Sequence, residues 1–146
     1  MPICRLLALS GISCLLSLTL SAQDLSNHRW QHRILLVIGE DAQAPYFQQQ
    51  LQELQSQAAG LTERKLVVYQ LTPQAYRQGL EAKSPWAKGN KAYQQYRQNA
   101  NAFEVVLIGL DGDVKLRRTD LLSCRELFAT IDVMPMRRQQ LRQKEN

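Results

Sequence analysis

The sequence predicts an α/β domain with a mixed β-sheet, and three patterns indicate it. Residues 33–38 form an unbroken aliphatic run that ends at Gly39, which is typical of a strand buried on both faces. A helical pattern and a second aliphatic run follow, as in a β-α-β unit with parallel strands. Later in the chain, an Asp-Gly pair separates two more β-type runs and predicts an antiparallel hairpin.

The first connection is predicted to be a helix over residues 42–59. Three large apolar residues recur along one face of this segment: Phe47, Leu51 and Leu54. Gly60 is expected to stop the helix. Residues 65–69 are rich in β-type side chains and are expected to form the second strand, which completes a right-handed β-α-β unit.

Residues 72–102 are harder to assign because two prolines and two glycines interrupt them. A helix is expected there only over residues 90–98. A β-hairpin is predicted next, with strands over residues 104–110 and 114–118 joined at the Asp-Gly pair 111–112. A type I′ turn is expected at this pair, because both central residues of that turn need a positive φ.

A capping box predicts the start of the last helix: Ser123 is followed three residues later by Glu126. Pro135 is expected to end this helix, and a basic segment follows it. The resulting order is β-α-β-α-β-β-α, with a mixed four-stranded sheet and helices on both faces. This order is the minimal thioredoxin-like arrangement.

The N-terminal segment predicts export. Arg5 is followed by an uncharged apolar run over residues 6–20, then by small residues and a polar stretch, which is the pattern of a cleavable signal peptide over residues 1–22. The run is shorter than the roughly 20 residues of a membrane-spanning helix. The domain is therefore expected over residues 23–141, in the periplasm or outside the cell, with a basic tail over residues 142–146.

An uncleaved N-terminal anchor is the alternative, and membrane contact is expected only through it. Loss of the signal peptide leaves 17 Lys and Arg against 13 Asp and Glu, because only Arg5 is removed from the 18. This mild excess is compatible with anionic partners, but no nucleic acid is expected. Cys4 and Cys14 leave with the signal, so Cys124 is a buried thiol, a reactive thiol or the link of a dimer.

Several segments together resemble a family of exported bacterial domains. They are residues 30–37, the Glu-Arg pair 63–64, the hairpin at residues 106–117 and the closing segment 131–139, which contains Met-Pro-Met-Arg. The same domain is similar to modules of vertebrate secreted matrix proteins, the DUDES-type group that includes sushi-repeat proteins. The resemblance covers residues 24–141 and implies a thioredoxin-like fold without an established activity.

A thioredoxin-like redox site would lie directly after the first strand. Such a site needs Cys-x-x-Cys at the N-terminus of a helix, where the helix dipole lowers the thiol pKa. Residues 39–44 contain no cysteine, so dithiol exchange is not expected. Glu40 and Asp41 lie there instead, at the carboxyl end of a strand, where α/β proteins bind ligands. The plainer interpretation is that two acids favour the helix dipole.

Cys124 and the two histidines also have both a functional and a plain interpretation. A helix start and the neighbouring Arg125 would lower the pKa of Cys124, although the residue is equally consistent with ordinary packing. His28 and His32 are four residues apart, but zinc needs more ligands than these two histidines supply, so no metal is expected.

The basic C-terminal segment, with Arg137 and Arg138, could contact an anionic envelope component or acidic partner, or could simply be a solvated end. Arg137 could also form a local salt bridge with Asp132.

The sequence therefore predicts an exported, non-catalytic, thioredoxin-like binding domain that takes no cofactor. Its partner would be an unidentified protein or envelope component, bound through Glu40 and Asp41 or through Arg137 and Arg138. One alternative is a single-cysteine thiol redox protein that uses Cys124. Another is an envelope structural or stress protein that works by self-association.

Overall fold

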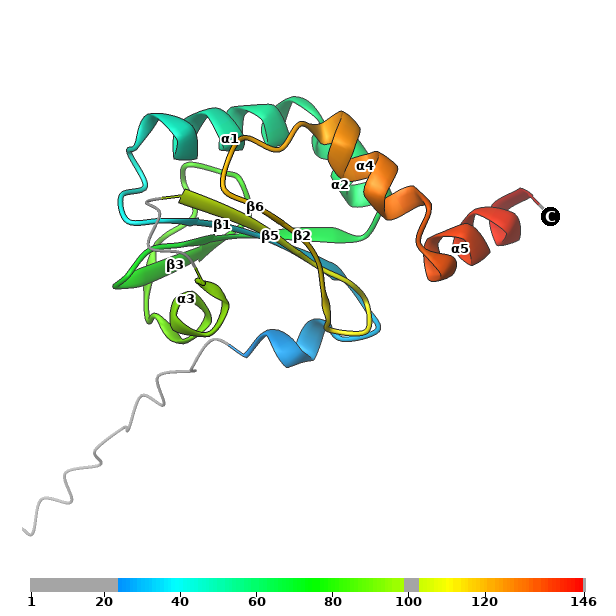
Figure 1. The fold of residues 1–146 in the computed structure, drawn as a ribbon, viewed down its shortest axis with the longest axis horizontal. Helices are drawn as coiled ribbons and strands as arrows, with labels where there is room; N and C mark the ends of the chain where they lie inside the picture. The colour runs from blue at the N-terminus through cyan, green and yellow to red at the C-terminus, as the bar shows by residue number, and fades with distance from the viewer. Residues whose placement is uncertain (1–23, 99–102, 146) are drawn as a thin grey trace, which may run out of the picture.

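A mixed β-sheet organises the protein, whose structure, a computed structural model, describes residues 24–98 and 103–145. The signal peptide predicted over residues 1–22 lies outside these ranges. In the described part of the chain the sheet has six strands, in the order β4-β3-β2-β1-β5-β6 (Figure 1). The α/β class and the mixed sheet predicted from the sequence are therefore confirmed.

Strand β1 (Arg33–Gly39) lies at the centre of the sheet. It pairs in parallel with β2 (Leu66–Leu71) and antiparallel with β5 (Phe103–Ile108). Strand β6 (Val114–Arg118) continues the sheet antiparallel to β5. The aliphatic runs that predicted these strands are local patterns, which explains why the sequence was sufficient to find them.

The expectation of four strands is wrong, because a small hairpin extends the sheet beyond β2. It consists of β3 (Ala75–Gln78) and β4 (Ala87–Lys88), with β3 antiparallel to β2. Both strands are short, and β3 is largely half-buried while β4 is exposed. Such edge strands carry no continuous apolar run, and the glycines and prolines around them hide them from pattern analysis.

Helices cover both faces of the sheet (Figure 1). One face carries α1 (Pro45–Ser56), α2 (Ala58–Glu63) and α4 (Cys124–Asp132). The other carries α3 (Lys91–Tyr96) and a short 3-10 helix, η1 (Leu25–His28).

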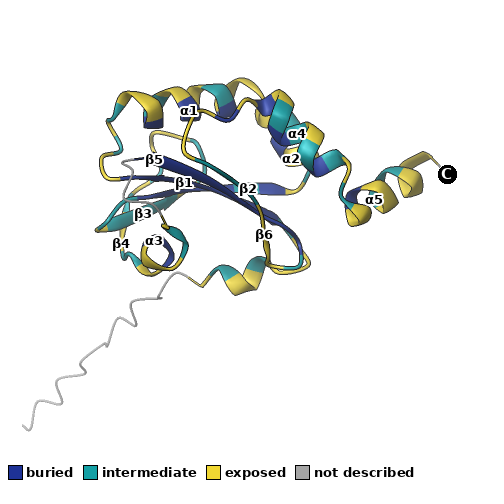
Figure 2. Cartoon of the chain, in the orientation of Figure 1, coloured by how far each residue is buried: buried dark blue, intermediate teal, exposed yellow. Residues whose placement is uncertain are grey.

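All seven residues of β1 are buried (Figure 2). Its alternate side chains enter two core clusters, one under each helical layer. This is the burial expected of a strand covered on both faces.

Gly60 does not stop a helix, contrary to the prediction, but lies inside α2. A Cβ atom at Gly60 would lie only 2.7 Å from ring atoms of Phe128 on α4. The missing side chain therefore lets α4 pack closely on α2, a requirement that residue spacing along the chain does not reveal.

The tip of the β5–β6 hairpin contains Gly112 at φ +88°, as expected of a turn glycine. The turn is not type I′, however, because Asp111 does not have the positive φ that this type requires. The Gly112 amide donates to the carbonyl of Gly109 at 3.1 Å, and the Gly109 amide donates to the carbonyl of Asp113 at 2.9 Å. These bonds define a three-residue hairpin loop, the class in which a type I turn is followed by a residue with positive φ, here Gly112.

Pro135 begins a helix instead of ending one. Helix α4 stops at Asp132, and α5 (Pro135–Glu145) extends away from the sheet (Figure 1). Proline is well suited to the first helical position, where no amide hydrogen is needed. The predicted basic tail is therefore helical through Glu145. No helix in the described part of the chain combines the length and apolarity needed to cross a membrane.

Candidate functional site

Glu40 and Asp41 follow β1 at the surface, as the sequence predicted, but α1 begins only at Pro45. Both acids therefore lie before the first turn of the helix, so the dipole interpretation does not explain them. The Glu40 carboxylate forms an ion pair with Arg97 at 2.8 Å. The Asp41 carboxylate accepts the amide of Gln43 at 2.8 Å. Each acid thus has a local partner of its own.

Cys124 is buried beneath α1, with 3% of its surface exposed. Its sulfur lies 3.5 Å from the carbonyl oxygen of Glu53, to which the thiol donates. Burial, together with the nearby Glu53 carboxylate, raises the pKa of the Cys124 thiol to about 11. The thiolate is therefore scarce at neutral pH, and the sulfur cannot reach a second chain without local opening.

His28 and His32 meet on the opposite face of the sheet. Their Nδ1 atoms lie 3.4 Å apart, and Nε2 of His28 lies 2.8 Å from the hydroxyl of Tyr69. Burial lowers the pKa of His28, and the adjacent His32 adds to the shift. In residues 24–98 and 103–145, no group of three or more histidine, cysteine or acidic side chains is arranged to hold a metal ion.

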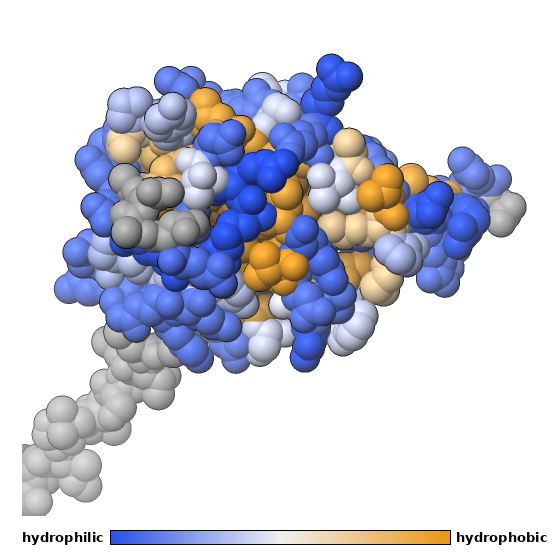
Figure 3. All heavy atoms as spheres, viewed as in Figure 1, coloured by the Kyte–Doolittle hydropathy of each residue, from blue (hydrophilic) through white to orange (hydrophobic). Residues whose placement is uncertain are grey.

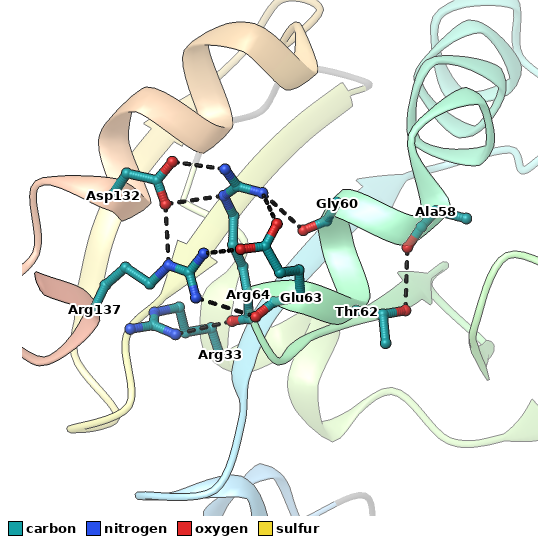
Figure 4. Close-up of polar contacts among 8 residues, drawn as sticks. All are labelled: Arg33, Ala58, Gly60, Thr62, Glu63, Arg64, Asp132 and Arg137. Atoms are coloured by element: carbon teal, nitrogen blue, oxygen red, sulfur yellow. Dashed lines mark hydrogen bonds and ion pairs between the residues drawn. The ribbon is translucent and has the colours of Figure 1, made fainter. Parts of the chain in front are cut away.

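A cluster of charged side chains, three of them largely buried arginines, lies at the other end of β1, where α2 and α4 end and α5 begins (Figure 4). We call it the arginine cluster. It consists of five residues: Arg33, Glu63, Arg64, Asp132 and Arg137. The guanidinium of Arg137 is 2% exposed, so this residue, predicted to bind a partner at the surface, is part of the interior.

Asp132 is the centre of the arginine cluster. Its two carboxylate oxygens accept from Nε and Nη2 of Arg64, at 3.0 and 2.6 Å, and one of them also accepts from Nε of Arg137 at 3.1 Å. The local salt bridge between Arg137 and Asp132 that the sequence suggested is therefore present. Burial alone would raise the pKa of Asp132, but the hydrogen bonds from Arg64 and Arg137 outweigh it and hold that pKa below its usual value.

Arg137 also closes the cluster on the side of α2. Its Nη2 pairs with the Glu63 carboxylate at 2.6 Å, and its Nη1 donates to the Glu63 carbonyl at 3.2 Å. The hydrogen bond from Arg137 lowers the pKa of Glu63, so both acids of the cluster are ionised at neutral pH. Arg64 in turn stacks over the ring of Phe128, 4.1 Å from its centroid. These contacts fix α2, α4 and α5 to one another.

Arg33 is the member of the cluster that sequence reasoning missed, because it stands at the head of an aliphatic run. It is 1% exposed, and its Nη1 donates to the carbonyl of Arg64 at 2.8 Å. Its Nε is buried with no hydrogen-bond partner among the residues that the structure describes. An arginine inside a strand that is otherwise aliphatic was the available signal, since a buried charge needs partners.

Arg138 and the rest of the basic segment lie on α5, and Arg138 itself is exposed. Two hydrophobic side chains near the start of this helix, Val133 and Met136, are also exposed. Figure 3 shows a largely hydrophilic face on which hydrophobic side chains gather near the centre and near the α4–α5 junction. Arg138 thus remains accessible to a partner, unlike its neighbour Arg137.

Comparison with known proteins gives a family. The model of a family described as "Domain of unknown function (DUF4174)" matches residues 24–140, so the chain belongs to that family. No curated protein matches the chain, and no solved structure does.

Proposed function

We propose that this DUF4174 domain is an exported, non-catalytic binding domain with a thioredoxin-like architecture. The strand order supports the architecture. Four consecutive strands, β2-β1-β5-β6, combine one parallel pair with two antiparallel pairs, and a helix follows β6. This is the minimal thioredoxin-like order, to which β3 and β4 are added at the edge beside β2.

The observation that carries the non-catalytic proposal is the segment between β1 and α1. A thioredoxin-like dithiol would lie there, yet residues 39–44 contain no cysteine. The pKa of about 11 and the burial of Cys124 also weigh against the alternative of a single-cysteine redox protein. In residues 24–98 and 103–145, neither chemistry finds the accessible thiolate that it needs.

An insulin-reduction assay with dithiothreitol tests this proposal. We expect no turnover above the background of dithiothreitol alone, for both the wild-type protein and Cys124→Ser. Turnover that is present in the wild type and lost in Cys124→Ser would establish the thiol alternative. In a titration of thiol reactivity against pH, native Cys124 should react with an apparent pKa near 11, and the unfolded chain with one near 9.0.

Export rests on the sequence pattern of residues 1–22. Mass spectrometry of the protein isolated from its own cells should show an N-terminus near Ala22 to Asp24. An intact Met1 in the membrane fraction would instead establish the uncleaved anchor.

A further inference from the structure

The arginine cluster does not balance its charge. Its three arginines face two carboxylates, which leaves one excess positive charge, and the excess falls on Arg33. Arg64 and Arg137 each contact a carboxylate, whereas the Arg33 guanidinium donates to the backbone carbonyl of Arg64 (Figure 4). A desolvated guanidinium with unused donors is costly, so such a group calls for an anionic partner.

A pocket of about 230 Å³ lies beside Arg33, between the tip of the β5–β6 hairpin and the start of α5. Its walls are mostly apolar and are formed by Leu110, Met134, Pro135 and Met136. The other charges that line it, Lys115 and Asp111, neutralise each other through an ion pair at 2.5 Å. Arg33 is therefore the uncompensated charge of the pocket.

The start of α5 adds to the positive potential at this pocket. The first amide of α5 to find an acceptor inside the helix is that of Arg138, which donates to the Met134 carbonyl at 3.0 Å. The amides of Met136 and Arg137 precede it and have no intrahelical acceptor, as in the first turn of any helix. The positive end of the helix dipole thus lies at residues that line the pocket.

From these observations we propose that the pocket beside Arg33 binds a small organic monocarboxylate with an apolar body. The carboxylate accepts hydrogen bonds from the Arg33 guanidinium, and the apolar body contacts Leu110 and the two methionines. A cavity of about 150 Å³ can hold a benzene ring, so 230 Å³ suits a ligand of the size of benzoate. The inference rests on the proposed function as a non-catalytic binding domain and names the class of its ligand.

Calorimetric titration of the purified protein with sodium benzoate, at constant ionic strength, tests the proposal. We expect saturable binding to one site. Benzyl alcohol, which has the ring but no charge, and inorganic phosphate, which has charge but no apolar body, should each bind about tenfold more weakly or worse. This ratio reflects the loss of a charge-assisted hydrogen bond or of the apolar contacts.

Three variants locate the site. Arg33→Met keeps the length and the apolar stem of the side chain but removes the donors, and should weaken benzoate binding about tenfold or more. Met136→Glu adds a carboxylate to the pocket wall, beside that of Asp111, and should weaken benzoate binding through repulsion. If Arg33→Met does not fold, this second variant tests whether the pocket is the binding site. Arg125→Met removes an exposed arginine of α4 and should bind benzoate as the wild type does.

Several results would overturn the proposal. They are the absence of benzoate binding, equal binding of benzyl alcohol or of phosphate, and unchanged benzoate binding by a folded Arg33→Met or by Met136→Glu. Failure of the proposed function is separate, because it would appear as thiol-dependent turnover in the insulin assay, which does not involve this pocket.

Discussion

At the amino end of β1 three largely buried arginines meet two partly exposed acids, whereas at its carboxyl end Glu40 and Arg97 form an ion pair at the surface. The side chains of Arg64 and Asp132 are 13% and 33% exposed, and those of Arg97 and Glu40 are 21% and 57% exposed. Water therefore screens the ion pair of Glu40 more than the ion pairs of Asp132. The same ion pairing should therefore contribute very differently to stability at the two ends.

The contrast also bears on where to look for function. Ligands of α/β proteins commonly bind at the carboxyl ends of strands, and sequence reasoning therefore pointed to Glu40 and Asp41. In this structure the uncompensated charge and the pocket beside it are at the opposite end, at Arg33. The topological rule is general, whereas the buried Nε of Arg33, which has no hydrogen-bond partner among the described residues, is an observation on this structure.

The largest effect should follow from Asp132→Asn, which keeps the shape of the side chain and removes its charge. Arg64 and Arg137 would then retain their positive charges with one carboxylate fewer. Removing one partner of a buried ion pair lowers the free energy of unfolding by about 3–5 kcal/mol. Because Asp132 is itself 33% exposed, we expect a loss at the lower limit, about 3 kcal/mol. Urea unfolding at neutral pH measures this free energy.

Asp113→Asn is the matched control for this variant. Asp113 is 74% exposed and lies 3.9 Å from Lys115, so its neutralisation should change the free energy of unfolding by less than about 0.5 kcal/mol. A loss at Asp132 no larger than the loss at Asp113 would mean that the arginine cluster does not hold α4 and α5 in place.

The arginine cluster should also make the protein sensitive to acid. The pKa of Asp132 is lower in the folded protein than its ordinary value of 3.8, so its contribution is complete above that value and is lost as pH falls through the folded pKa. Urea midpoints measured across this range should fall steeply with acid for the wild type and less steeply for Asp132→Asn. Equal slopes would show that other carboxylates cause the loss.

The sequence revealed the central strands but not the cluster, and the reason is the separation of the partners along the chain. The aliphatic runs of β1, β2 and β5 are visible within a window of a few residues. Arg137 meets Glu63 across 74 positions, and Arg64 meets Asp132 across 68. Only the bond between Arg137 and Asp132, five positions apart, could be suggested from local spacing.

Other differences have a similar origin. The β3–β4 hairpin was missed because its strands are short and lack a core face of their own. Gly60 was taken for the end of a helix because a ring 68 positions away, that of Phe128, determines why no side chain fits there. For the candidate site, the positions of Glu40, Asp41 and Arg138 at the surface were predictable, whereas the burial of Arg137 and Cys124 depended on tertiary packing.

A smaller effect, of the opposite sign, should follow from Arg33→Met. This change removes a desolvated cation that forms no ion pair in the described part of the chain. The positive charge of Arg137 repels it, and the more weakly acting carboxylate of Asp132 attracts it. The change also loses the hydrogen bond to the Arg64 carbonyl. We expect the free energy of unfolding, measured without added ligand, to stay the same or rise by up to about 1 kcal/mol. A loss of more than about 2 kcal/mol would make Arg33 a structural residue like Asp132.

A small loss of stability should come from the carboxyl end of β1, through Glu40→Gln. Its carboxylate lies 2.8 Å from Nη2 of Arg97, within the range of 2.6–3.1 Å that the ion pairs of Asp132 span, so distance alone would predict similar importance. Arg97 also contacts Tyr93, through the hydroxyl and the face of the ring, and should keep its position when Glu40 loses its charge. Because water surrounds most of the Glu40 side chain, we expect Glu40→Gln to lower the free energy of unfolding by only about 0.2–1 kcal/mol. Added salt screens the ion pair and should make this loss smaller still. Urea unfolding of Glu40→Gln beside Asp132→Asn, at low and high salt, compares the two ends directly. If the two variants lose the same stability, then burial does not distinguish the ends of β1, and the argument that singles out Arg33 loses its physical basis.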